Sequence, residues 1–278
     1  MPAAVVPVLV GTGAALQGLH QLNLPVLIPT LLVALLIQIG TNFANDVFDF
    51  RRGADTADRL GPLRVTHAGL VSPKQVLTAT YLTFGLALLI GMYLVTIGGW
   101  PILLIGLVCL LAGLTYTGGP WPFGYHGLGD LVCFICFGVL AVLGTAYLHR
   151  PEITPLDIWT SIPVGCLVTA ILIVNNLRDI DTDRQTGKMT LAVYLGRRGT
   201  RLEYAACVAI AYLVALWLGL NGMVGQWWWL PLLSLPLGVW LVRYVGQTEG
   251  RPLNQGLKRT GQLHLLFGAL FALALWLG

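Results

Sequence analysis

Long stretches without any charged side chain are the feature that most restricts what this chain can fold into. No Asp, Glu, Lys or Arg occurs before Asp46, and further uncharged runs cover residues 75–129, 131–149, 158–177, 204–242 and 260–278. A helix needs about 20 mainly apolar residues to cross the hydrocarbon core of a bilayer. Some of these runs hold one crossing and the longer ones hold two. Because irregular backbone cannot be exposed to lipid, we predict an all-α polytopic membrane protein.

The hydropathy pattern predicts about nine transmembrane helices. The expected spans are residues 3–19, 25–48, 73–97, 101–116, 128–148, 156–177, 201–220, 224–244 and 261–277. We expect them to form a single domain over residues 1–278, arranged around a central cavity, with pseudo-halves at about 1–148 and 149–278. The 34 glycines allow these helices to pack closely or to leave room for a ligand.

Basic residues are concentrated in the loops that follow the second, sixth and eighth predicted spans. With their flanks, these loops hold 15 of the 16 Lys and Arg residues, and only Arg150 lies on the other side. Cytoplasmic loops are enriched in Lys and Arg, so this side is predicted to face the cytoplasm. The net charge of +4 follows from the same bias and indicates no nucleic-acid partner. The five cysteines fall within apolar spans, and we interpret them as small buried side chains.

Two acidic clusters stand at the ends of two apolar stretches. They contain Asn45, Asp46 and Asp49 in the first cluster and Asn176, Asp179, Asp181 and Asp183 in the second. Side chains at i, i+3 and i+4 share one face of a helix, so each cluster can direct several oxygen atoms at one point. Asp46 lies about 100° round the helix from Asn45 and is expected to bind through water or a second ion. Asp181 lies off the shared face of its cluster and is expected to be solvated.

Folding stability alone does not explain carboxylates at these positions. The C-terminal end of a helix carries partial negative charge, which favours Lys or Arg there. One interpretation is that the acids are ordinary interfacial residues paired with Arg51, Arg52 and Arg184. The matched spacing of the two Asn/Asp clusters favours a cation site instead.

The chemistry of the clusters indicates which cation they would hold. Oxygen ligands without Cys and without a nearby His are typical of Mg²⁺, which shares its coordination with substrate phosphates. Arg178 and Lys188 stand where they can bind the same phosphates. We therefore predict a diphosphate site at the cytoplasmic edge of a membrane cavity, for an amphiphilic ligand with a hydrocarbon tail.

Four short segments carry a specific resemblance to a known family. They are residues 116–120 (YTGGP), 124–130 (GYHGLGD), 175–183 (NNLRDIDTD) and 187–193 (GKMTLAV). These segments resemble the 1,4-dihydroxy-2-naphthoate branch of the UbiA superfamily of intramembrane prenyltransferases, which makes menaquinone or phylloquinone precursors. The first acidic cluster resembles the Asn-Asp-x-x-Asp motif of that superfamily. The similarity extends from about residue 8 to about residue 196.

The resemblance implies a reaction and roles for particular residues. The implied reaction is Mg²⁺-dependent transfer of a prenyl group from a prenyl diphosphate to 1,4-dihydroxy-2-naphthoate, with loss of CO₂, at a bacterial inner membrane. The implied metal ligands are Asn45, Asp46, Asp49, Asp55, Asp179 and Asp183, and the implied diphosphate ligands are Arg178, Lys188 and Asn176. Tyr116 is expected to stabilise an allylic cation through its ring face, and Asp130 to hold or deprotonate an acceptor hydroxyl.

Two departures from the family pattern stand out. Many members carry a third acid four residues after the second, where this chain has Gly53, so Asp55 is expected to replace it. Members also usually carry a basic Arg-Pro segment before the first span, and that segment is missing here, so no role of it in closing the site is expected.

Other functions stay open from the sequence, as do the length of the donor tail and the oligomeric state. Within the enzyme class, the acceptor could be 4-hydroxybenzoate, homogentisate or a chlorophyllide. A transporter of small solutes is the alternative from another class. Transporters place ionisable residues near the bilayer midplane, whereas the predicted span centres here are almost free of charge.

Overall fold

A computed structural model describes residues 1–17, 21–54, 60–62 and 64–278 of the chain. Within these ranges the fold is helical and has no strand, which confirms the all-α prediction. The elements in chain order are α1 (Pro2–Ala15), α2 (Leu24–Arg51), α3 (Pro73–Gly98), α4 (Trp100–Thr115), the 3₁₀ turn η1 (Phe123–Tyr125), α5 (Gly129–Cys133), the π-helix η2 (Phe134–Leu140), α6 (Ala141–His149), α7 (Pro155–Gln185), α8 (Leu191–Leu220), the 3₁₀ turn η3 (Leu230–Ser234), α9 (Leu235–Gln247) and α10 (Leu253–Leu277).

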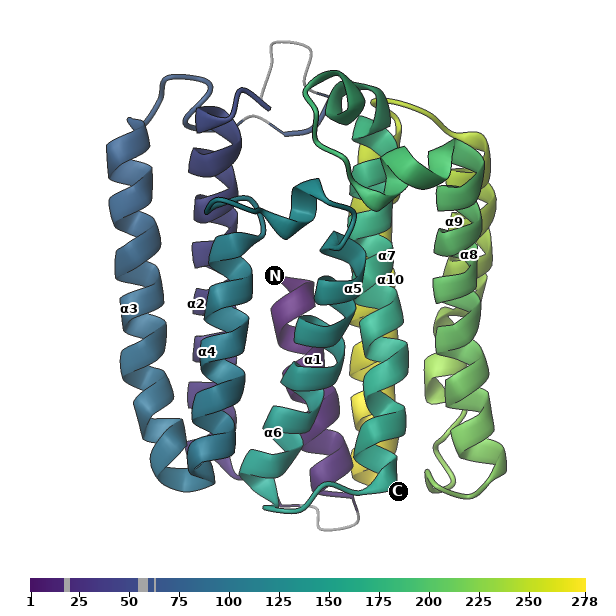
Figure 1. Cartoon of the computed structure of the whole chain (residues 1–278). Helices are drawn as coiled ribbons and strands as arrows, with labels where there is room; N and C mark the ends of the chain where they lie inside the picture. Colours follow the sequence, from purple (N-terminus) through teal and green to yellow (C-terminus); the bar gives the residue numbers. More distant parts are fainter. Residues whose placement is uncertain (18–20, 55–59, 63) are drawn as a thin grey trace.

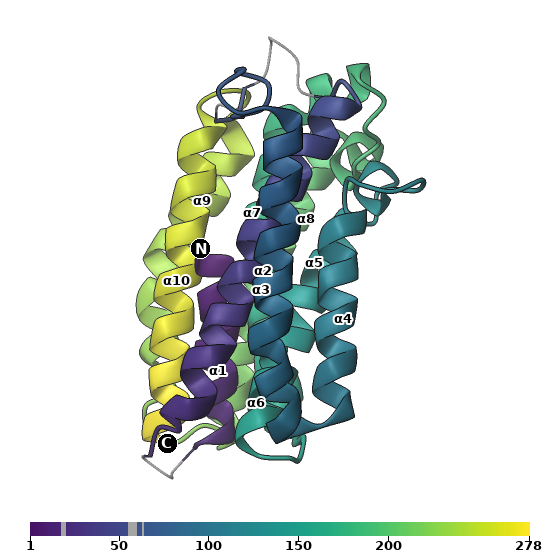
Figure 2. The ribbon, with the colours of Figure 1, turned by 90° about the vertical axis from the view of Figure 1, so that its left-hand side faces the viewer.

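The long helices stand side by side with nearly parallel axes (Figure 1). Helices α2, α3 and α4 form one side of the bundle, and α7, α8, α9 and α10 form the other. The loops after α2 and after α7 lie at the same end, drawn at the top. Helix α1 begins inside the bundle and runs to the opposite end, where it packs on α10 and α6 (Figure 2). The ends of α2 and α7, which carry the two acidic clusters, therefore share one end of the molecule.

Six helical segments are long and apolar enough to cross a membrane. They are Leu24–Arg51, Pro73–Gly98, Gly129–His149, Pro155–Gln185, Leu191–Leu220 and Leu253–Leu277, and the apolar helices Pro2–Ala15 and Trp100–Thr115 are shorter. The protein is therefore an integral membrane protein. Each of the nine predicted stretches overlaps a helix. That all nine cross the membrane stays a prediction.

Local signals explain where several helices begin and end. Ser72 and Thr154 form capping boxes at the starts of α3 and α7, and Pro73 and Pro155 follow them at the first helical position. Helix α3 is capped by Gly99, whose φ of 69° is costly for any residue with a Cβ atom. The chain turns there directly into α4, so α3 and α4 form a helical hairpin.

The predicted fifth span is not one continuous α-helix. It begins as α5, passes through the seven-residue π-helix η2 and continues as α6. A Cβ atom on Gly138 would lie 2.4 Å from the Cα atom of Gly165, so η2 and α7 are in backbone contact. Such contacts between small residues are typical of helix packing in membranes.

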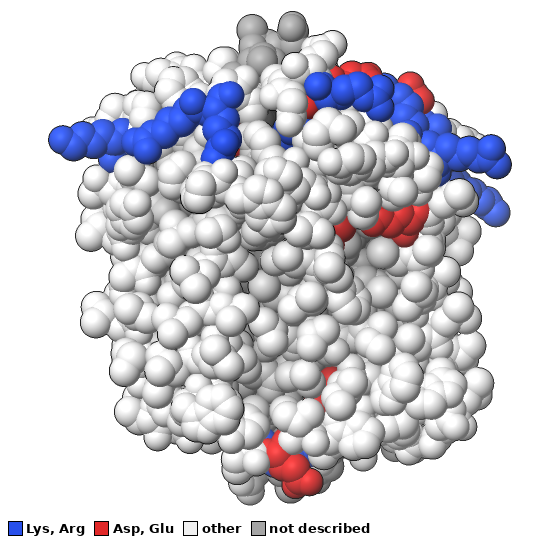
Figure 3. Space-filling model, in the orientation of Figure 1, with Lys and Arg blue, Asp and Glu red and all other residues white. Residues whose placement is uncertain are grey.

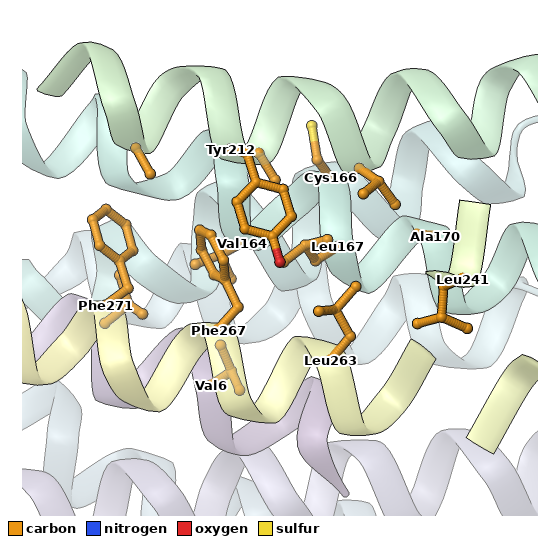
Figure 4. Close-up of a cluster of buried hydrophobic side chains, with 14 of the residues drawn as sticks. Val6, Val164, Cys166, Leu167, Ala170, Tyr212, Leu241, Leu263, Phe267 and Phe271 are labelled. Carbon is orange, nitrogen blue, oxygen red and sulfur yellow. The ribbon is translucent and has the colours of Figure 1, made fainter. Parts of the chain in front are cut away.

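The largest buried core lies between α1, α7, α8 and α10 (Figure 4). The Tyr212 and Phe267 rings meet edge to face, with centroids 5.3 Å apart. A Cβ atom on Gly268 would lie 2.2 Å from a methyl carbon of Val6, so α1 lies directly on α10. Helix α7 is central in this packing, and its most apolar 18-residue window is 72 % buried against 17 % for α2. This packing fixes the position of the second acidic cluster.

Lys and Arg side chains gather at the end of the molecule that carries the loops after α2 and α7 (Figure 3). At the opposite end Arg150 forms an ion pair of 2.6 Å with the buried Asp157. This asymmetry agrees with the basic bias of the sequence, and the acidic clusters lie at the basic end.

Candidate active site

Asp49 is the most highly connected carboxylate of the first cluster. It lies in the last turn of α2 and is 2 % exposed. Its Oδ1 atom accepts a hydrogen bond of 2.9 Å from the Tyr125 hydroxyl, and its Oδ2 atom lies 3.3 Å from Arg64 Nη2 and 3.4 Å from Lys188 Nζ. Asn45, one turn earlier, accepts a bond of 3.0 Å from the Thr117 hydroxyl. The end of α2 is thus held by groups from three other parts of the chain.

Lys188 joins the two clusters. It follows α7, and its backbone N–H donates to the carbonyl oxygen of Asp183 at 2.8 Å. Burial lowers the pKa of Lys188, but the charges of Asp49 and Asp183 outweigh this and hold that pKa above its ordinary value of 10.5. Lys188 is therefore a positive side chain placed between Asp49 of the first cluster and Asp183 of the second.

Tyr125 lies beside this ion pair. The Lys188 ammonium lies 5.4 Å from the centre of the Tyr125 ring, and the guanidinium of Arg52 lies 5.5 Å from it. Burial and the charge of Asp49 raise the pKa of Tyr125 well above its ordinary value, so the phenol stays a hydrogen-bond donor. An isolated bridge between His126 and Met189 fastens this loop to the loop after α7.

Asp46 does not share the surroundings of Asn45 and Asp49. Its oxygens accept hydrogen bonds from the backbone N–H groups of Val65 and Thr66, at 3.2 Å and 3.4 Å, and the residue is 6 % exposed. Asp46 therefore holds the backbone of the loop between α2 and α3 at Val65 and Thr66. Its expected contact with a cation stays a prediction. Asp55 lies outside the described residues.

Arg178 and Asp179 form a pair in the last turns of α7. Arg178 Nε lies 2.8 Å from Asp179 Oδ1, and Arg178 Nη2 lies 2.5 Å from Oδ2. Arg178 also donates to the side-chain oxygens of Asn175 and Asn254, at 2.9 Å and 2.8 Å, and its side chain is fully buried. Direct contact of Arg178 with a diphosphate stays a prediction, and this arrangement disfavours it.

The other members of the second cluster differ in exposure. Asn176 is buried, at 3 % exposure, and Asp183 is half-buried beside Lys188. Asp181 forms an ion pair of 2.5 Å with Arg197, and its side chain is 63 % exposed. The solvated position predicted for Asp181 is therefore observed.

Tyr116 caps the C-terminal end of α4, and Asp130 lies in the first turn of α5. A Cβ atom on Gly124 or on Gly129 would lie 3.2 Å from the Tyr116 ring, so these two glycines make room for it. The ring also meets Phe123 edge to face, with centroids 5.4 Å apart. Asp130 is 4 % exposed, and its Oδ1 atom has no hydrogen-bond partner in the described part of the chain.

A cavity of about 500 Å³ extends from the first cluster into the bundle. Asn45, Asp49 and Lys188 line its polar end, and Tyr116 lines it close by. The lining farther inside is apolar. It includes Leu94, Ile102 and Leu148, which belong to a buried cluster between α2, α3, α4 and α6. Such a site suits a ligand with a charged head and a long apolar tail.

The carboxylates do not form a compact metal cage. No group of three or more His, Cys, Asp or Glu side chains that could hold an ion occurs among the described residues. Mg²⁺ is usually bound through one or two carboxylates plus substrate phosphates and waters, so a cage is not required. The oxygens of Asn45, Asp49, Asn176, Asp179 and Asp183 fit that requirement in type, being hard ligands. Of these residues, Asn45 and Asp49 line the cavity, whereas Asn176, Asp179 and Asp183 stand outside its lining.

Sequence reasoning missed the contributions of Tyr125, Arg64, Thr117 and Asn254. Tyr125 and Thr117 stand inside segments that resemble the family, but nothing in their spacing showed that they reach α2. Arg64 carried only the signal of a basic loop residue, and Asn254 carried none.

The chain is similar in sequence to known prenyltransferases. Residues 4–248 match the UbiA prenyltransferase family. The chain is 36% identical to 1,4-dihydroxy-2-naphthoate octaprenyltransferase of Bacillus subtilis (strain 168), over 99% of this chain and 88% of that protein. It is 38% identical to the protein of the same name from Escherichia coli (strain K12), over 100% of this chain and 92% of that protein.

The fold is also shared with a solved structure, that of a UbiA homolog from Archaeoglobus fulgidus bound to GPP and Mg²⁺. The TM-score is 0.68 at 17% sequence identity, over 99% of this chain and 95% of the other. At this identity the likeness concerns the fold alone. With the family match over most of its length, the chain belongs to the UbiA prenyltransferase family.

Proposed function

We propose that this protein transfers a prenyl group from a prenyl diphosphate to 1,4-dihydroxy-2-naphthoate, with loss of CO₂. The observation that carries the proposal is the contact between Lys188 and Asp49 at the polar end of an apolar cavity. This contact joins the two acidic clusters where a diphosphate would lie. The names of the bacterial relatives supply the acceptor and the donor class.

The charged groups at the polar end would bind the diphosphate. Lys188 offers a positive charge from the cavity wall, and Arg64 lies beside it on Asp49. Asn45, Asp49, Asp179 and Asp183, with Asn176 beside them, would hold Mg²⁺, the ion seen with GPP in the Archaeoglobus homolog. When bound, the ion would neutralise charge on the leaving diphosphate.

The chain's own residues would then govern each step. Ionisation of the allylic C–O bond leaves the electron pair on the diphosphate, where Lys188 stabilises it. The Tyr116 ring, held in place by Gly124 and Gly129, would stabilise the allylic cation. Asp130 would accept a hydrogen bond from an acceptor hydroxyl and so raise the electron density of the ring that attacks the cation. The apolar lining excludes water, which would otherwise capture the cation.

We further propose that the site faces the cytoplasm of a bacterial inner membrane. Lys and Arg side chains gather at the end of the molecule where the clusters lie, which supports this orientation (Figure 3). The charged groups of both substrates would then be reached from the cytoplasmic side. The tail would lie between the helices, within the membrane.

The test is a transfer reaction with purified protein in detergent or lipid nanodiscs. Dihydroxynaphthoate labelled with ¹⁴C in its carboxyl group is supplied with a panel of prenyl diphosphates, and products are identified by mass spectrometry. We expect a prenylated naphthoquinol and release of ¹⁴CO₂. Transfer with the label retained would exclude the naphthoate reaction. Transfer only to 4-hydroxybenzoate, homogentisate or a chlorophyllide would assign another acceptor.

A further inference from the structure

We propose that Arg178 and Asn254 are positioning residues that hold Asp179 in place and tie it to the loop between α2 and α3. The inference rests on the proposed function, because it assigns Asp179 as a ligand of the metal and diphosphate. It concerns a chain of hydrogen bonds that joins α7, α10 and that loop. Asn254 lies in the first turn of α10, 76 residues from Arg178 along the chain.

The first link is the contact between Arg178 and Asp179. Both oxygens of Asp179 accept hydrogen bonds from this one guanidinium, at 2.8 Å and 2.5 Å. A planar guanidinium that binds a carboxylate through two parallel bonds fixes its orientation as well as its position. An ionised carboxylate has about four acceptor positions, so two remain for a cation or its waters.

The second link is Asn254. Its Oδ1 atom accepts from Arg178 Nη1 at 2.8 Å, while its Nδ2 atom donates to the carbonyl oxygen of Leu60 at 2.8 Å. The amide thus bonds to the guanidinium on one side and to the loop backbone on the other. Asn175 accepts a further bond from Arg178 Nη2 at 2.9 Å, so most donors of this buried guanidinium are engaged.

Gly61 completes the contact with the loop. A Cβ atom on this residue would lie 2.7 Å from Arg178 Nη2 and 3.0 Å from Cζ, so the loop backbone rests directly on the guanidinium. The same loop is held from the other side by Asp46, which accepts from the backbone of Val65 and Thr66. The first acidic cluster therefore contacts this loop directly, through Asp46 and Asp49, and the second is connected to it through Arg178 and Asn254.

The arrangement gives different roles to the two basic side chains near the second cluster, Lys188 and Arg178. Lys188 lines the cavity and faces Asp49, so it can meet a phosphate directly. Arg178 would have to break its bonds with Asp179, Asn175 and Asn254 to do so. Its charge acts through Asp179, whose geometry it sets.

Two substitutions at Asn254 test the two ends of this series of hydrogen bonds, the bond to Arg178 and the bond to Leu60. Asn254→Leu removes both the acceptor for Arg178 and the donor for Leu60. Asn254→Asp keeps an acceptor for Arg178 but lacks the donor for Leu60. Gln255→Leu, at the neighbouring exposed position on α10, is the matched control.

Metal affinity is the first readout, because a purely structural role would not move it. Binding of Mn²⁺ in the presence of inorganic diphosphate is followed by electron paramagnetic resonance. Loss of a group that orients a metal ligand typically weakens metal binding about 10- to 100-fold. We expect a loss in this range for Asn254→Leu, and less than about 3-fold for Asn254→Asp and Gln255→Leu, whose Arg178–Asp179 contact is kept. The Mg²⁺ concentration for half-maximal transfer should rise in parallel, with KM for the acceptor unchanged.

Attachment of the loop is the second readout. Limited trypsin digestion should cleave between α2 and α3 faster in both Asn254 variants than in wild type or Gln255→Leu. Unchanged metal binding in a folded Asn254→Leu protein would overturn the positioning role, and unchanged digestion in both variants would overturn the tie to the loop. If Asn254→Leu does not fold, Asn254→Ser, which is too short to reach either partner, replaces it. Neither readout requires prenyl transfer, so wild-type protein that binds Mn²⁺ and diphosphate but transfers no prenyl group would refute the proposed function alone.

Discussion

Replacing Lys188 by Met is the most informative single change, because it removes the positive charge that the loop after α7 places on Asp49. Two unit charges 3.4 Å apart attract by about 5 kcal/mol at an effective dielectric constant of about 20. The desolvation of the buried ammonium offsets much of this attraction. Asp49 also keeps its bonds to Tyr125 and Arg64. We therefore expect Lys188→Met to lower the free energy of unfolding by only about 1–3 kcal/mol.

The effect of Lys188→Met on catalysis should exceed its effect on folding. A hydrogen bond to a charged group contributes about 1.5–3 kcal/mol, and the contact with the leaving diphosphate strengthens as charge develops. The loss corresponds to about a 10- to 100-fold fall in kcat/KM for geranyl diphosphate. Lys74→Met, at the exposed first turn of α3, is the matched control and should stay within about 2-fold of wild type. A Lys188→Met enzyme that is folded and equally active would refute the assignment of Lys188 to the diphosphate.

Three further outcomes follow from the same structure. Asp183→Ala should abolish transfer while the protein keeps its fold in gel filtration, and excess EDTA should do the same to wild type; activity in either case would contradict the metal site. Because Asp49 and Asp183 raise the pKa of Lys188, the ion pair is fully present below 10.5 and is lost only as pH rises through the raised pKa. The thermal stability of wild type relative to Lys188→Met should therefore not decline from about pH 7 to pH 9, and a decline in that window would contradict the pairing. Gly138→Ala should lower the free energy of unfolding by about 1–3 kcal/mol, because the added methyl group meets the backbone of α7, which cannot move away. Gly106→Ala, whose methyl group meets open space, should not lower it. Equal melting temperatures for the two variants would show that the contact between η2 and α7 is loose.

The fold class and the acidic clusters could be predicted from local features of the sequence. Uncharged runs identify membrane helices because the bilayer penalises charge at every position along them. The spacing of Asn45 and Asp49 shows that they share a helix face, and the structure places both at the cavity. Asp181 likewise lies off the shared face, is exposed and pairs with the half-buried Arg197.

The remaining features depend on contacts that spacing does not encode. Asn254 meets the backbone at Leu60 across 194 residues, and Tyr125 reaches Asp49 across 76. Nothing local distinguishes Arg178, which turns into the protein, from Lys188, which faces the cavity. The π-helix was missed for a similar reason, since it depends on how η2 packs on α7.

The central claim is that the ends of α2 and α7 hold one and the same diphosphate. A double-mutant cycle with Asp49→Asn and Asp183→Asn tests it, with the free energy of binding of geranyl diphosphate measured by isothermal titration calorimetry in the presence of Mg²⁺. If both carboxylates act on one bound complex, their effects should be coupled by about 1 kcal/mol or more, so that the second substitution costs far less than the first. Effects that add to within about 0.5 kcal/mol would mean that the two helix ends bind independently, and would contradict the account.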